Sequence, residues 1–159
     1  MKRKIFLLLH NIRSVYNVGA IFRTADAVSV SKIILSGYTP TPVDRFGNLR
    51  GDFVKCSLGA EKTMAWEYVK NPSKTLEGLK KLGFEIISVE QGKNSVDYKK
   101  IKPKAKSLIV FGTEVSGILP IILRKSDVIA EISMSGEKES LNVSVSAGIV
   151  LYRWFDDRY

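Results

Sequence analysis

The chain has 159 residues, which fits one domain, so we expect residues 1–159 to fold as a single unit. Hydrophobic residues make up 45% of the chain, enough for a sizeable core, and no apolar run approaches the ~18 residues that span a membrane. Cys56 is the one cysteine, which excludes an internal disulfide and favours a cytoplasmic setting. The net charge of +9 favours a nucleic-acid partner, with a basic protein that has no such partner as an equal alternative.

The first third of the chain alternates strand and helix signals. Residues 4–10 (KIFLLLH) form an apolar run typical of a strand buried on both faces. An apolar stripe predicts a helix over 17–30 with Asn17 as its N-cap, and 32–36 (KIILS) predicts a second strand. The segment 37–53 follows as a long loop, and loops of this length are usually functional or disordered.

The rest of the chain repeats this alternation. The next elements in chain order are predicted as a helix over 61–70, a helix over 73–82, a strand over 84–90, a basic connector over 97–106, a strand over 107–112, a helix over 119–125 and a strand over 127–132. The last segment, 140–152, starts with a strand-like alternation, but its length and late position favour a helix with Ser140 as its cap. The repeated β-α-β order predicts an α/β fold, a mostly parallel sheet flanked by helices.

The common signatures of catalysis and cofactor binding are absent. The sequence has no phosphate-binding loop of the G-x-x-x-x-G-K-[ST] type and no G-x-G-x-x-G dinucleotide turn. With one cysteine and one histidine, His10, the residue types also argue against a zinc site, and we expect no metal. Function must therefore be sought in three other stretches.

The first stretch is NVGAIFRTADA, from Asn17 to Ala27. A capped helix start offers free N–H groups for a phosphate, Gly19 would let a ligand approach the backbone, and Arg23 could grip a phosphate with two hydrogen bonds. The structural alternative is that Asn17 only caps the helix and Arg23 only pairs with Asp26. The residues alone favour this alternative.

The second and third stretches each follow a predicted strand. FGTEVSGI, residues 111–118, places Glu114 in a polar loop where α/β proteins bind ligands, although a plain strand-to-helix turn is an equal alternative. ISMSGEKESLNVSVSAG, residues 132–148, leads through a glycine-containing loop to Ser140 and Asn142. Such residues at a helix start often do no more than cap it.

Together the three stretches resemble the three signature motifs of the SpoU/TrmH-type RNA ribose methyltransferases of the SPOUT superfamily. NVGAIFRTADA is similar to the first motif, FGTEVSGI to the second, F-G-x-E-x-x-G, and ISMSGEKESLNVSVSAGIVLY to the third, with its S-L-N-V-S-V-A core. The motifs occur in order and span most of the chain. One departure is Ser133, where the family usually has proline, which puts the rigidity of that loop in doubt.

The resemblance implies a parallel α/β sheet with a C-terminal trefoil knot that binds S-adenosylmethionine (AdoMet), and a homodimer whose site is completed across the interface. The backbone around four residues would hold the adenine and ribose of AdoMet: Gly112, Ile132, Met134 and Leu141. The functional positions that match the family are Asn17, Arg23, Glu114, Ser140 and Asn142. The reaction implied is methyl transfer to a ribose 2′-hydroxyl. Because a free arginine side chain holds its proton up to about pH 12, we expect Arg23, supplied by the other protomer, to position the reacting groups rather than act as a base.

The partner implied is RNA, with transfer RNA favoured over ribosomal RNA, and no membrane. We expect Arg13, Arg45 and Arg50 to contact the RNA, and the lysines of the 97–106 connector to add a salt-dependent attraction to phosphates. The alternatives left open are methylation of ribosomal RNA, methylation of a base, and an RNA-binding protein on the same scaffold that has lost catalysis.

Overall fold

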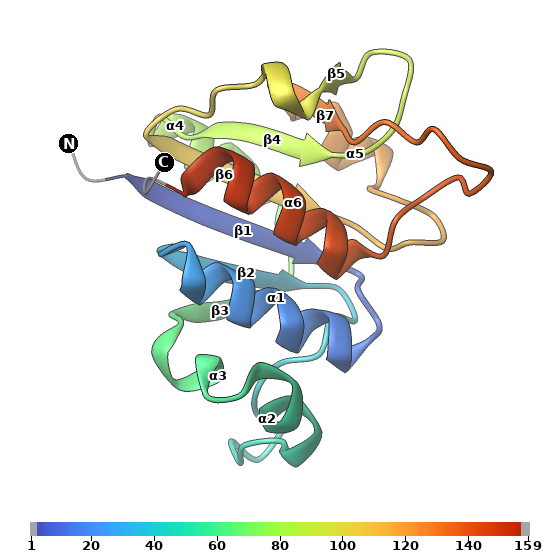
Figure 1. Cartoon of the computed structure of the whole chain (residues 1–159). Coiled ribbons are helices and arrows are strands. Elements are labelled where there is room, and N and C mark those ends of the chain that lie inside the picture. The colour runs from blue at the N-terminus through green and yellow to red at the C-terminus, as the bar shows by residue number, and fades with distance from the viewer. Residues whose placement is uncertain (1–2, 157–159) are drawn as a thin grey trace.

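The computed structural model describes residues 3–156, which form one seven-stranded sheet with helices on both faces (Figure 1). Every strand pairing is parallel, and the strand order is β3-β2-β1-β6-β4-β7-β5. The strands are β1 (Lys4–His10), β2 (Lys32–Ser36), β3 (Trp66–Val69), β4 (Glu85–Val89), β5 (Val96–Asp97), β6 (Lys106–Phe111) and β7 (Val128–Glu131). The helices are α1 (Val15–Ala27), α2 (Gly51–Ser57), α3 (Ala60–Thr63), α4 (Pro72–Lys81), α5 (Pro120–Leu123) and α6 (Val143–Phe155), with a 3₁₀ turn η1 (Tyr98–Lys100). The predicted α/β class and parallel sheet are confirmed, and the trefoil knot stays a prediction.

Strand β1 divides the apolar core into two parts. Successive side chains of a strand point to opposite faces, so Leu7 and Leu9 lie in one cluster with α1 and α6, while Phe6 and Leu8 lie in the other with α4 and α5. Burial on both faces explains why the strand is apolar throughout. Figure 1 shows α1 and α6 side by side on one face of the sheet. Within residues 3–156, no helix has the length and hydrophobicity needed to cross a bilayer.

Two predicted elements were wrong in the region after β2. The predicted helix over 61–70 ends early, because α3 stops at Thr63 and residues 66–69 instead form the edge strand β3, which pairs with β2. The sequence WEYV is rich in aromatic and β-branched residues, and such residues suit a half-exposed strand better than a helix. The predicted loop 37–53 also ends early, because α2 begins at Gly51 and is anchored by the fully buried Phe53.

The starts of the two long helices differ from the prediction. Helix α1 begins at Val15, and its N-cap is Ser14, whose Oγ accepts from the backbone N–H of Asn17 at 3.2 Å. Helix α6 begins at Val143 and is capped by Asn142, not by Ser140. A cap must lie two or three residues before the N–H that it satisfies, and only Ser14 and Asn142 meet this requirement here. The side chain of Asn17 therefore does not cap the helix and can form other hydrogen bonds.

Gly19 serves packing between helices and not the approach of a ligand. A Cβ atom at this position would lie 2.5 Å from the Cβ of Cys56 on α2. The missing side chain thus lets α1 and α2 pack closely, and the expected contact with a ligand backbone was wrong.

Candidate functional site

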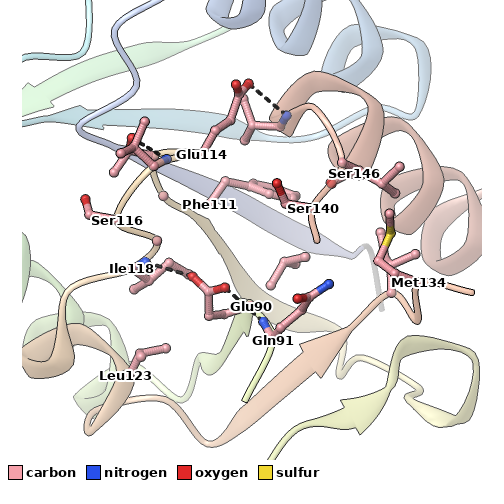
Figure 2. Close-up of a pocket in the computed structure, with 18 residues that line it drawn as sticks. Glu90, Gln91, Phe111, Glu114, Ser116, Ile118, Leu123, Met134, Ser140 and Ser146 are labelled. Carbon is pink, nitrogen blue, oxygen red and sulfur yellow. Dashed lines mark hydrogen bonds between the residues drawn. The ribbon is translucent and has the colours of Figure 1, made fainter. Parts of the chain in front are cut away.

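A ligand-sized cavity of about 440 Å³ lies at the carboxyl ends of β4, β6 and β7 (Figure 2). Its walls come from residues 89–91 after β4, 111–118 after β6 and 132–143 after β7. The carboxyl edge of a parallel sheet is where α/β proteins bind ligands, and the volume falls within the ~300–1,000 Å³ of small-molecule sites. All four residues predicted to surround the cofactor line this cavity: Gly112, Ile132, Met134 and Leu141. Their role stays a prediction.

The charged side chains that line this cavity are acidic. Among residues 3–156, Glu90 and Glu114 are its ionisable side chains, and no lysine, arginine or histidine lines it. Figure 2 shows Glu90, Glu114 and Met134 projecting from three different segments around the space. The described residues also contain no group of three side chains that could hold a metal ion. A ligand with positive charge is therefore favoured here over a phosphorylated one.

The loop after β6 is held in shape by two glycines and Glu90. Gly117 has a φ of +68°, and a Cβ there would collide with the Glu90 carboxylate. Glu90 Oε2 accepts from the backbone N–H of Ile118 at 2.9 Å, which ties this loop to the end of β4. A Cβ at Gly112 would meet the carbonyl oxygen of Gly117 at 2.7 Å. Sequence reasoning missed Glu90, although a carboxylate at the carboxyl end of a buried strand was a usable signal.

A hydrogen-bond network joins the three motifs at the rim of the cavity. Asn17 Nδ2 donates to Glu114 Oε1 at 3.0 Å, and Asn142 Nδ2 donates to Asn17 Oδ1 at 3.1 Å. The backbone N–H of Val143 donates to the same Glu114 Oε1 at 3.2 Å. The structure thus brings together three of the five predicted catalytic residues.

The first N–H groups of α6 are all occupied by side chains. Glu114 accepts from the first, while Asn142 Oδ1 accepts from Ser144 at 2.9 Å and from Val145 at 3.4 Å. The carboxylate of Glu114 also lies at the positive end of the helix dipole, where negative charge is stabilised. These donors are therefore not free to bind a phosphate.

A second cavity, of about 280 Å³, shares residues 113–116 and Val143 with the first. Its other walls include Ser14, Asn17, Tyr38 and Arg13, whose guanidinium carbon lies 5.3 Å from the centre of the Tyr38 ring. Glu114 thus lines both cavities, Asn17 lines the second, and Arg13 places a positive charge in the second cavity. An anionic cavity next to a cavity that contains an arginine suits a reaction between a cationic and an anionic molecule.

Two predicted catalytic residues lie apart from the network. Ser140 is exposed and lines the first cavity. Arg23 is exposed on α1 and lines neither cavity. Among residues 3–156 it has no ion-pair partner, since Asp26 instead accepts from Thr63 Oγ1 at 2.9 Å. The suggested Arg23–Asp26 pair is thus absent from the described part of the chain.

The remaining predicted RNA contacts lie on two separate surfaces. Arg45 and Arg50 line an open groove of about 710 Å³, in which Arg50 makes a two-bond ion pair with Asp52, at 2.7 and 3.1 Å. This hydrogen bonding raises the pKa of Arg50 above its ordinary value. The connector 97–106 leads from β5, at the sheet edge opposite β3, back to the start of β6, and none of its residues lines this groove.

The chain matches the SpoU rRNA Methylase family over residues 4–152. It is 34% identical over 147 residues to a 23S rRNA (guanosine-2′-O-)-methyltransferase of Neisseria meningitidis, an alignment that covers 92% of this chain and 56% of that protein. The chain spans about 56–60% of the length of the curated relatives that it matches.

Two solved structures are similar to this fold. A TrmH/SpoU tRNA-modifying enzyme of A. aeolicus has a TM-score of 0.85 and 29% identity, with 99% of this chain and 76% of that chain covered. An AdoMet-bound rRNA methyltransferase of Sinorhizobium meliloti has a TM-score of 0.85 and 25% identity, with 96% and 56% covered. The similarity therefore includes a structure solved with AdoMet.

Proposed function

The chain belongs to the SpoU/TrmH family of RNA methylases, and from this premise we propose that it transfers a methyl group from AdoMet to a ribose 2′-hydroxyl of RNA. The observation that carries the proposal is the Asn17–Glu114–Asn142 network, because Glu114 of this network lines both the anionic cavity and the cavity that contains Arg13. One cavity would take the methyl donor and the other the nucleotide.

The lining of the first cavity fits AdoMet. When bound, AdoMet supplies an electrophilic methyl group on a positively charged sulfonium. Glu90 and Glu114 give that cavity the charge that a cation requires, and the absence of lysine and arginine from its lining disfavours nucleotide cofactors that carry phosphates. The backbone around Gly112, Ile132, Met134 and Leu141 would hold the adenine and ribose.

The second cavity would receive the target nucleotide. Arg13 lies within it and can neutralise a phosphate, and the side chains of Asn17 and Glu114 are within reach of a hydroxyl placed beside them. Alignment of the ribose oxygen with the methyl group would supply much of the rate, because a positioned reaction avoids the entropy cost of encounter. Arg23 would help to orient the nucleotide and its phosphate.

We propose further that the protein is a homodimer and that Arg23 reaches the site of the partner. Three large side chains on the outer surfaces of α1 and α6 support an interface: Tyr16, Val145 and Tyr152, which are 74%, 49% and 42% exposed. These two helices lie side by side, so their outer surfaces form one continuous face (Figure 1). Burial of this face in a dimer would also place Arg23 of one subunit against the partner subunit.

The substrate we propose is transfer RNA. A TrmH/SpoU tRNA-modifying enzyme, of which the chain covers 76%, supports this choice, although a relative named for ribosomal RNA is also similar to the chain.

Two measurements test the proposal. Calorimetric titration with AdoMet should give binding that is lost when the 132–141 loop is replaced. Nucleoside mass spectrometry of transfer RNA and ribosomal RNA after treatment should then show a 2′-O-methyl nucleoside in transfer RNA. A methylated base would refute the ribose target, methylated ribosomal RNA alone would refute the substrate, and a folded protein that binds RNA but not AdoMet would refute catalysis.

A further inference from the structure

The segment 41–50 is an ordered hairpin that presents an aromatic ring to solvent. Val43 and Leu49 form an antiparallel bridge, and Asp44 Oδ1 accepts from the backbone N–H groups of Phe46 and Asn48 at 2.8 and 2.9 Å. These bonds fix the backbone of the tip. Even so, the Phe46 side chain is 72% exposed.

The Phe46 ring has no packing role within the described chain. Its one ring contact is with Arg45, whose guanidinium carbon lies 4.7 Å from the ring centre. A single exposed apolar residue is ordinary on a protein surface. What distinguishes Phe46 is that it sits on a fixed backbone, beside a cation and near two further exposed rings.

These two rings are Tyr68, which lines the same groove as Phe46, and Tyr38, which lines the second cavity. Tyr68 is 45% exposed and donates from its hydroxyl to the carbonyl oxygen of Gly37 at 2.8 Å, which holds the ring against the segment that follows β2. Tyr38, the next residue, is 50% exposed and lines the second cavity with Arg13. Tyr68 and Phe46 both line the open groove. Tyr38, Tyr68 and Phe46 thus form an aromatic strip that leads away from the candidate site.

The two arginines along this strip differ in whether they already form an ion pair. Arg50 forms an ion pair with Asp52, but Arg45 has no carboxylate partner among residues 3–156. Arg45 can therefore contact a phosphate while its neighbour Phe46 contacts a base. Aromatic rings interleaved with cations are how proteins bind unpaired nucleic-acid strands, because every base offers a flat face for stacking.

We propose that the aromatic strip binds single-stranded RNA next to the target nucleotide, with one unpaired base stacked on Phe46 and an adjacent phosphate held by Arg45. This inference rests on the proposed function for the identity of the polymer. A base within a regular duplex has both faces covered by its neighbours, so the strip selects an unpaired segment such as a loop.

The probe that tests this is a fluorescent oligoadenylate of about 12 nucleotides that contains 2-aminopurine, compared with an RNA duplex of the same length. We expect Phe46→Ala to weaken single-strand binding by about tenfold to a hundredfold and to abolish the 2-aminopurine quenching. Phe46→Tyr should retain both, and Phe46→Leu should behave like Phe46→Ala because it keeps apolar bulk but loses the ring. Leu82→Ala is the matched control, since Leu82 is 64% exposed and follows α4 on the opposite face of the sheet.

Three results would overturn the inference: unchanged affinity of Phe46→Ala, full binding and quenching by Phe46→Leu, or no binding of the single strand by the wild-type protein at low salt. Titration with AdoMet separates this inference from the proposed function, because Phe46→Ala should bind AdoMet as the wild type does. Phe46-dependent RNA binding without AdoMet binding would refute the methyltransferase and leave the aromatic strip standing.

Discussion

Asn17 and Glu114 are 97 positions apart in the chain, yet Asn17 Nδ2 donates to Glu114 Oε1 at 3.0 Å. On the other side of the same amide, Oδ1 accepts from Asn142 at 3.1 Å. One amide thus connects three segments that lie far apart in the sequence. Because its donor end meets a carboxylate and its acceptor end meets an amide N–H, its orientation is fixed. Such a fixed group can align a substrate without paying the cost of ordering itself.

The first prediction concerns Asn17→Ala. Its two hydrogen bonds are solvent-exposed, so their loss should change the free energy of unfolding by less than about 1 kcal/mol. Methyl transfer should fall on the order of 10²-fold, since Glu114 and Asn142 lose their common partner. Urea unfolding and a methyl-transfer assay measure the two effects, with Asn94→Ala in an exposed turn as the control. Full activity would show that the network has no role in positioning.

The second prediction separates two functions of Asn142. Asn142→Ala removes the cap of α6 and should cost about 1 kcal/mol of unfolding free energy. Asn142→Asp keeps the oxygen that accepts from Ser144 and Val145 but loses the donor to Asn17. We therefore expect the Asp variant to be about as stable as the wild type and to lose activity like Asn17→Ala. If the Asp variant remains active, Asn142 acts only as a cap.

The sequence predicted the sheet because its strands are buried on both faces and therefore apolar, as in β1 and β6. It failed at β3, whose register is set by pairing with β2 and not by local pattern. In the site, the three motifs identified Asn17, Glu114 and Asn142. The assignment of caps was wrong, because Ser14 is as plausible a cap as the predicted Asn17, and Asn142 is as plausible as the predicted Ser140. Glu90 was missed because its contact with Ile118 depends on two loops that only the fold brings together.

The third prediction contrasts two helical glycines. Gly19→Ala should lower the free energy of unfolding by about 1–3 kcal/mol at every protein concentration, because the added Cβ overlaps the Cβ of Cys56. Gly148 has nothing within 4 Å of an added Cβ, so Gly148→Ala should stabilise α6 by about 0.5–1 kcal/mol in the isolated chain. Any cost at Gly148 must then come from a partner subunit and should appear only at concentrations where the dimer forms. Unfolding and sedimentation across a dilution series measure this, and a concentration-independent loss for Gly148→Ala would contradict it.

The fourth prediction tests whether Arg23 acts across a dimer. Arg23→Ala and Asn17→Ala should each be nearly inactive alone. If each site combines Asn17 of one subunit with Arg23 of its partner, every mixed dimer contains one intact site. After random exchange, half of the dimers are mixed, so activity should return to about a quarter of the wild-type value. Subunit exchange is followed with two affinity tags, and exchange without recovered activity would mean that one subunit supplies both Asn17 and Arg23 to each site.

The fifth prediction concerns His10 at the buried end of β1. Its Nδ1 lies 2.7 Å from Ser36 Oγ, and its Nε2 is buried without a hydrogen-bond partner among the described residues. Burial lowers the pKa of His10 below its ordinary value of 6.5, because the charged form loses its hydration.

This pKa shift fixes the direction of the pH dependence. Below about pH 6.5 the unfolded chain takes up a proton at His10 that the folded chain resists, so stability is present above this pH and is lost as the pH falls toward the lowered folded pKa. His10→Asn can keep a hydrogen bond to Ser36 but cannot titrate. Urea unfolding at about pH 7.5 and about pH 5.5 should therefore show a smaller pH-dependent loss for His10→Asn than for the wild type. Equal losses in the two proteins would mean that other groups carry the acid sensitivity and that the His10 imidazole is protonated as readily in the fold as in the unfolded chain.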